Sequence, residues 1–89
     1  MDRAEAYKLA QDELGAIEEA GYIAASEHID TIALKEVTSL SGKAYEIELS
    51  YLWKESEHED ILVICRVTSK SWFTHQQLEE SITLCSDAI

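Results

Sequence analysis

Two apolar runs between residues 43 and 70 constrain the fold of this chain more than any other feature. In the first run, 45–53, apolar side chains alternate with Glu46, Glu48 and Ser50, which is the period of a strand with one buried face. The second run, 61–68, is apolar on both sides in its first half, as is typical of a strand that lies inside a sheet and is covered twice. Residues 54–60 (KESEHED) are short enough to close an antiparallel hairpin, although they lack the Asn-Gly or Gly-Gly signal of a tight turn.

The N-terminal segment, residues 2–20, predicts an amphipathic helix. Asp2 can cap it, Glu5 follows at the spacing of a capping box, and Gly21 is the expected residue after the last turn. A helix of this length is not stable alone, so its apolar stripe should lie on the sheet. The residues of this expected stripe are Tyr7, Ala10, Leu14 and Ile17.

The remaining segments are less sharply patterned. Residues 22–27 suit either an extension of the helix or a connection, and residues 29–37 alternate as a strand does. Toward the end of the chain two indications conflict. Thr74 and Gln77 stand at a capping-box spacing, which favours a helix, whereas the alternation over 79–85 favours a strand. We expect the strand, which would complete the sheet.

The expected fold class is α+β, in a single domain covering residues 1–89. Its N-terminal helix would pack on one face of a three- to four-stranded antiparallel sheet, a meander. The other face would be left to solvent or to a partner.

The charge of the chain limits its partners. Its formal net charge of −11 argues against binding to nucleic acid or to an anionic membrane, because both require positive charge facing phosphate. A basic protein partner suits this charge, and so does ordinary solvation of an acidic protein. No apolar run approaches the roughly 20 residues of a membrane span, and the start of the chain does not read as a secretory signal, so we expect a cytoplasmic protein.

The sequence contains no pattern that identifies a reaction or a bound cofactor. Its histidines lack the convergent spacing of a metal site, its glycines are isolated, and no nucleophile signature frames a serine or cysteine. We therefore expect no enzyme, no cofactor and no metal. Cys65 and Cys85 lie in apolar contexts without CxxC spacing, and we expect a reduced, buried pair, with a disulfide left open if their strands are neighbours.

Aromatic residues beside acidic charge are the features that favour binding. Trp53 ends the first run, and Trp72 and Phe73 follow the second. Such aromatics can close a core or can anchor a partner, and the surrounding carboxylates can be an ordinary solvated surface or an acidic rim that attracts a basic protein. The predicted partner-binding residues are Glu46, Glu48, Trp53, Glu55, Glu57, His58, Glu59, Asp60, Trp72 and Phe73.

Three stretches, MDRAEAYKLAQDEL, GKAYEIELSYLW and ILVICRVTSKSWF with LEESITL, resemble the small acidic cytoplasmic immunity proteins of bacterial polymorphic toxin systems. The resemblance implies a binding protein without catalytic residues, which inhibits a basic toxin domain by stoichiometric occlusion. Two alternatives remain. One is an acidic secretion chaperone, and the other is a self-associating, homodimeric structural or regulatory domain that uses the uncovered sheet face or a sheet edge.

Overall fold

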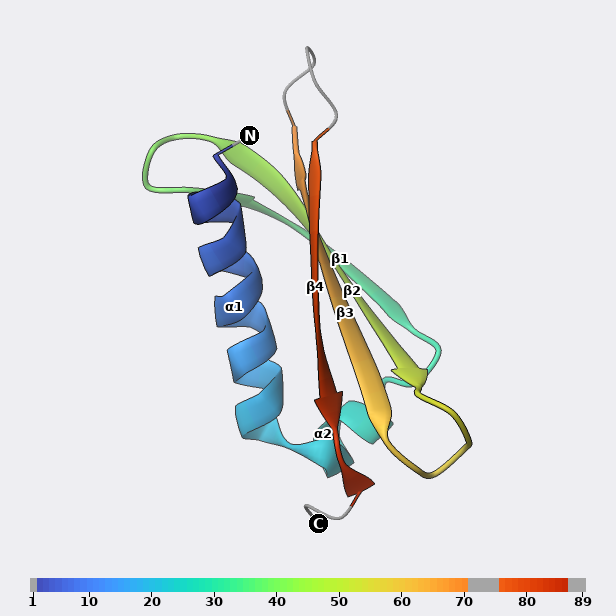
Figure 1. The fold of residues 1–89 in the computed structure, drawn as a ribbon. Helices are drawn as coiled ribbons and strands as arrows, with labels where there is room; N and C mark the ends of the chain where they lie inside the picture. Colours follow the sequence, from blue (N-terminus) through green and yellow to red (C-terminus); the bar gives the residue numbers. More distant parts are fainter. Residues whose placement is uncertain (1, 71–75, 87–89) are drawn as a thin grey trace.

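The structure, a computed structural model, describes residues 2–70 and 76–86 and consists of helices packed on one antiparallel sheet (Figure 1). The strands lie side by side in chain order, β1-β2-β3-β4, and each pairs antiparallel with the next. The expected α+β fold, a helix on an antiparallel meander, is therefore confirmed, with four strands. The elements are α1 (Arg3–Ala20), α2 (Tyr22–Ser26), β1 (Ile32–Thr38), β2 (Ala44–Trp53), β3 (Ile61–Ser69) and β4 (Gln77–Leu84).

Helix α1 begins and ends at the residues that the sequence indicates. The Asp2 carboxylate accepts a hydrogen bond from the Glu5 N–H at 3.1 Å, which satisfies one of the first unpaired donors of the helix. At the other end, Gly21 has φ +93° and its N–H donates to the Ile17 carbonyl at 3.0 Å. A side chain would be strained at that φ, so glycine lets the chain turn there and start α2.

The buried stripe of α1 differs from the expected one by a small rotation. Ala6, Ala10 and Leu14 are buried against the sheet, whereas Tyr7 is 49% exposed. Ala6 and Ala10 lie about one turn apart on the side that faces the sheet, and Tyr7 is turned by about 100° from Ala6 around the helix axis, so its side chain points away from that side. The expected burial of Tyr7 is therefore wrong, while Ile17 is partly buried against the core.

Two strands differ from expectation in their bounds. β1 begins at Ile32 rather than 29, because the preceding residues form a turn in which the Thr31 N–H donates to the His28 carbonyl at 3.0 Å. In the last segment the strand prediction is confirmed: β4 pairs with β3 from Gln77 to Leu84, so its backbone groups enter a ladder instead of a helix.

The core lies between α1 and the near face of the sheet, with α1 placed over β3 and β4 (Figure 1). β2 and β3 alternate strictly between buried and half-buried residues along most of their length. Leu14 and Val63 are both fully enclosed. The buried side chains are Ala6, Ala10, Leu14, Ala25, Tyr45, Ile47, Leu49, Tyr51, Ile61, Val63, Cys65, Val67, Leu78 and Leu84.

The two cysteines have different environments, and both are free thiols. Cys65 is buried in the core, and this burial raises the pKa of its thiol to about 11. Cys85 follows the last residue of β4 and is exposed, so the expectation of two buried cysteines is wrong for Cys85. Leu84 is buried, so by alternation the side chain of the next residue, Cys85, points away from the core.

Candidate protein-binding face

The face of the sheet opposite α1 is uncovered within the described residues (Figure 1). The expectation that β3 is covered on both sides is therefore wrong for this part of the chain. Ile61 and Val63 are buried beneath α1, but Leu62 and Ile64 point to the other side and are only half-buried. We call this side of the sheet the open face.

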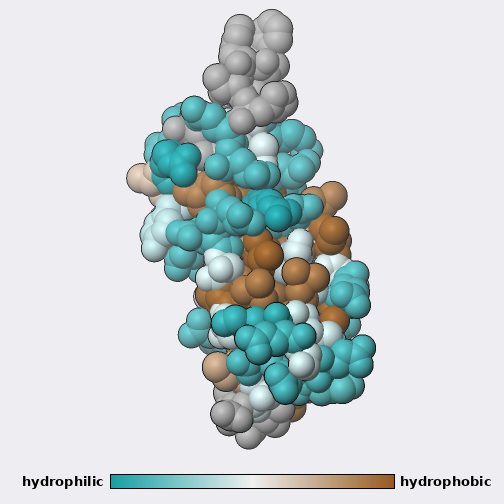
Figure 2. Space-filling model, turned by 45° about the vertical axis from the view of Figure 1, so that its right-hand side comes forward, coloured by the Kyte–Doolittle hydropathy of each residue, from teal (hydrophilic) through white to brown (hydrophobic). Residues whose placement is uncertain are grey.

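Apolar side chains from three strands gather on the open face. The strand register places Ile32, Ser50 and Ile64 in one row across the sheet, and Leu52 beside Leu62 in another. Ile32 and Leu34 are each 63% exposed and Leu52 is 40% exposed. Figure 2 shows a central apolar area with hydrophilic surface above and below it. The apolar cluster of the open face consists of Ile32, Leu34, Leu52, Leu62 and Ile64.

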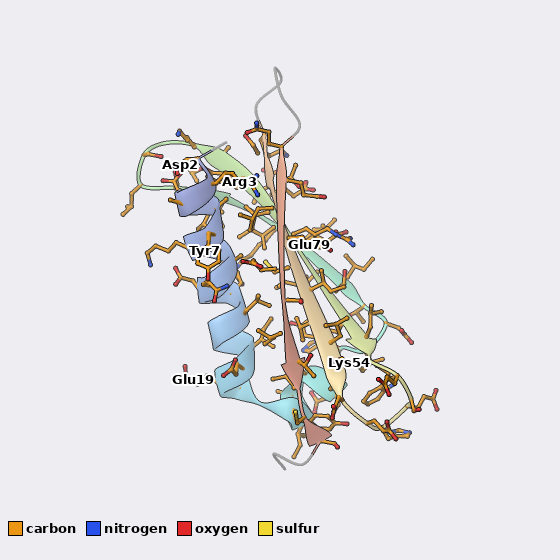
Figure 3. All side chains as sticks on the ribbon, viewed as in Figure 1. Asp2, Arg3, Tyr7, Glu19, Lys54 and Glu79 are labelled. Atoms are coloured by element: carbon orange, nitrogen blue, oxygen red, sulfur yellow. The ribbon has the colours of Figure 1, made fainter. Side chains whose placement is uncertain are left out.

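Beside this cluster, Arg66 forms ion pairs with carboxylates of both neighbouring strands. Its guanidinium donates to Glu48 Oε2 at 3.0 Å and to Glu79 Oε1 at 3.1 Å, so one cation serves carboxylates on both neighbouring strands. These hydrogen bonds raise the pKa of Arg66. Figure 3 places Glu79 on the side of β4 away from α1.

A second shared cation lies further along the same face. Lys70 pairs with Glu36, whose pKa it lowers by a hydrogen bond, and its Nζ is 3.9 Å from Glu46 Oε2. In these two networks four carboxylates share two cations, which leaves an excess of negative charge on the open face. The predicted site residues Glu46 and Glu48 therefore lie here.

A shallow depression of about 270 Å³ marks the open face between β3 and β4. Leu62 and Ile64 form its apolar part, and Glu79 and Ser81 supply polar groups. Apolar surface next to a carboxylate suits a lysine or arginine side chain, which has an apolar stem and a charged end.

The predicted residue Trp53 lies on the other side of the sheet, at the end of the β2–β3 hairpin. Its ring centroid is 6.4 Å from that of Tyr22 and 5.4 Å from that of His58, and it is partly buried against the core. The Tyr22 hydroxyl also donates to the Glu59 carbonyl. The contacts of Tyr22, Trp53 and His58 therefore hold α2 against the hairpin loop.

The hairpin loop closes without glycine because His58 takes a left-handed conformation, with φ +65°. The Glu59 N–H donates to the Ser56 carbonyl at 3.3 Å, and the Lys54 N–H donates to the Asp60 carbonyl at 2.8 Å. Glu55, Glu57 and Glu59 are exposed, whereas Asp60 Oδ1 accepts a hydrogen bond from the Ser86 N–H at 3.2 Å. Lys54 is labelled at this end of the sheet in Figure 3.

The structure thus separates the predicted site residues into two groups. Glu46 and Glu48 lie on the open face, and Trp53 lies with the loop 54–60 at the hairpin end. Trp72 and Phe73 lie outside the described residues. The apolar cluster is not among the predicted binding residues, although apolar residues on both sides of β3 were the signal for it.

Two further features, a cluster of metal-ligating side chains and a membrane-spanning helix, are absent from the described part of the chain. Residues 2–70 and 76–86 contain no group of three or more His, Cys, Asp or Glu side chains that could hold a metal ion. Within the same residues, no helix has the length and apolar character needed to cross a membrane.

The chain gives no significant match to protein-family models, to curated proteins or to solved structures.

Proposed function

We propose that this chain is a protein-binding module that inhibits a basic protein, in the manner of small acidic immunity proteins that occlude a bacterial toxin domain in the cytoplasm. The observation that carries the proposal is the open face, where an uncovered apolar cluster lies beside carboxylates that outnumber their cations. Contiguous apolar surface with a polar rim is typical of protein interaction sites.

Each part of the open face has a physical role in such a complex. Ile32 and Leu34 supply apolar area that gains free energy when a partner removes it from water. The surplus carboxylates and the exposed acids of the hairpin loop attract a basic surface over a distance and speed association. Inhibition then needs no chemistry, because a bound domain of this size covers the partner's functional groove.

The test of this function is stoichiometric inhibition of a captured partner. The tagged chain, incubated with native-host lysate at low salt, is expected to retain a basic protein that salt releases. That protein, produced alone, should be toxic or enzymatically active, and titration with the chain should abolish its activity at a one-to-one ratio. A captured protein that keeps full activity in the saturated complex would contradict the inhibitor function.

Self-association is a second candidate, favoured by one observation: the outer edge of β1 is unpaired within the described residues. The net charge of −11 on each copy opposes it, because two identical acidic surfaces repel one another. Sedimentation of the chain alone tests this second candidate, because a self-associating domain is dimeric without any partner and a monomer would exclude it.

A further inference from the structure

Strand β1 is an edge of the sheet, and no strand among residues 2–70 and 76–86 pairs with its outer side. The Ser39 N–H donates to the Lys43 carbonyl at 2.8 Å, and this bond determines which residues of β1 direct their backbone groups to β2. Because the pattern of an antiparallel pair repeats every second residue, Ala33, Lys35 and Val37 direct their backbone groups to β2. The N–H and C=O groups of Ile32, Leu34 and Glu36 therefore face outward.

The hydrogen bond from the Lys70 N–H to the Ala44 carbonyl, 3.1 Å long, supports this assignment of inward and outward residues. It shows that even-numbered residues of β2 bond to β3, so the odd-numbered residues of β2 are those that bond to β1.

The side chains of β1 leave this edge accessible. Charged residues on an edge strand ordinarily discourage pairing with another chain. Here Lys35 is ion-paired with Glu13 of α1, and Glu36 is ion-paired with Lys70, which follows β3. Both charged side chains of β1 therefore have partners within this chain. Apart from Val37, every residue of β1 is exposed, and α1 lies over β3 and β4 instead (Figure 1).

We infer that β1 binds an extended, basic segment of the partner as a fifth strand of the sheet. The inference rests on the proposed function and specifies how the partner is held. In an antiparallel or parallel addition, residues of the new strand that lie beside Ile32 and Leu34 extend the apolar cluster, so apolar side chains fit there. A lysine or arginine fits beside Glu36.

Charge selects a basic partner over a second copy of this chain. On the open face the four carboxylates of Glu36, Glu46, Glu48 and Glu79 share two cations, and the whole chain carries a net charge of −11. A cationic strand reduces this charge, whereas pairing β1 with its own copy brings two acidic sheets together.

Hydrogen exchange with a synthetic strand tests the inference on the intact chain. The probe is an eight-residue peptide in which valine alternates with lysine, and the matched probe carries N-methyl groups on the amides that would face β1. The first peptide is expected to slow exchange at the amides of Ile32, Leu34 and Glu36, and the methylated peptide is not. If neither peptide changes these amides at about 1 mM, a concentration that detects even weak binding, the inference is wrong.

Two variants at one position separate the backbone from the side chain. Leu34→Ala shortens the side chain and keeps the outward N–H, whereas Leu34→Pro also removes the N–H, which does not bond to β2. Leu34→Pro should bind the peptide about tenfold more weakly than Leu34→Ala, and thermal melting checks that both are folded. Equal affinities of the two folded variants would overturn the inference.

Failure of the inference and failure of the proposed function give different results. If a basic partner binds and is inhibited while the amides of Ile32, Leu34 and Glu36 stay unprotected, the function holds and the fifth strand is wrong. If no basic partner is inhibited, the function fails whatever the peptide does. A dimer of the free chain that Leu34→Pro abolishes would identify a second copy as the occupant and would overturn the choice of a basic segment.

Discussion

Glu5 shows how a single side chain connects distant parts of this fold. The sequence spacing assigns it to the cap of α1, and its N–H does bond to Asp2. Its carboxylate instead accepts hydrogen bonds from the Tyr45 hydroxyl at 2.8 Å and from the Ser41 hydroxyl at 2.9 and 3.1 Å. Local spacing could not indicate these contacts, because Tyr45 and Ser41 are 40 and 36 residues away.

The Glu5 contacts predict a pH-dependent contribution to stability. The hydrogen bond from Tyr45 is the main cause that lowers the pKa of Glu5 below its ordinary 4.5, so the fold favours the ionised carboxylate. This stabilisation is fully present above pH 4.5 and is lost as the pH falls through the lower pKa of the folded state. Glu5→Gln should therefore lower the melting temperature at pH 7 and have less effect at pH 3.

Glu18→Gln is the matched control for this measurement, because Glu18 is an exposed carboxylate on the same helix. An equal effect of Glu5→Gln at both pH values would show that the ionised hydrogen bond contributes nothing.

The two thiols predict different reactivities. A thiol reagent attacks the thiolate, and Cys65 is both buried and shifted to a pKa of about 11, while Cys85 is exposed. In the native protein one thiol should therefore react rapidly with the reagent, and the second should react only after denaturant is added. Cys85→Ser should remove the fast reaction and Cys65→Ala should keep it. Two fast thiols in the native protein would contradict the burial of Cys65.

At the scale of elements, the periodicity of the sequence predicts which segments are strands better than it predicts where they begin and end. Alternation in residues 45–53 identifies a hairpin strand and those of its residues that face the core. Residues 61–68 are also recognised as a strand, but their first half is apolar on both sides, so its core-facing residues follow only from the structure. The start of β1 was less predictable, since a turn bond at His28 and contact with β2 decide it. Which side of α1 is buried depends on its packing against the sheet, and the periodicity of the sequence does not determine this side to within one residue.

Packing of α1 on the sheet predicts unequal costs for the same substitution at two positions. Leu14 of α1 is buried against the sheet, whereas Leu40, in the β1–β2 turn, is fully exposed. Leu14→Ala should reduce the free energy of unfolding by about 3 kcal/mol, because it leaves a cavity, and Leu40→Ala should change it little. Urea denaturation measures both values. Equal values would show that α1 does not hold its stripe against the strands.

For the whole molecule, charge was easier to predict than the shape of the candidate site. Composition alone gives the acidic surface, and the loop 54–60 carries its densest stretch. The apolar cluster needs the strand register, because Ile32 and Ile64 are 32 positions apart in the chain and lie in one row only through β2. The separation of Trp53 from Glu46 and Glu48 follows from alternation, since odd and even positions of β2 face opposite sides.

The loop charges predict a kinetic effect at this scale. Reversal of Glu55, Glu57 and Glu59 to lysine should slow association with the captured basic partner roughly tenfold at low salt, because long-range attraction sets the encounter rate. Asp60 is left unchanged, because its carboxylate bonds to the Ser86 N–H. Stopped-flow measurements over a salt series test this. Unchanged rates at low salt would exclude the loop from steering.

The most direct test of the docking face compares two double variants that add the same charge in different places. Ile32→Lys with Leu34→Lys alters the open face, and Ile23→Lys with Leu40→Lys alters exposed apolar residues of α2 and the β1–β2 turn. In capture of the basic partner at low salt, the first pair should lose the partner and the second should retain it. Equal retention by both, or equal loss from both, would contradict docking on the open face.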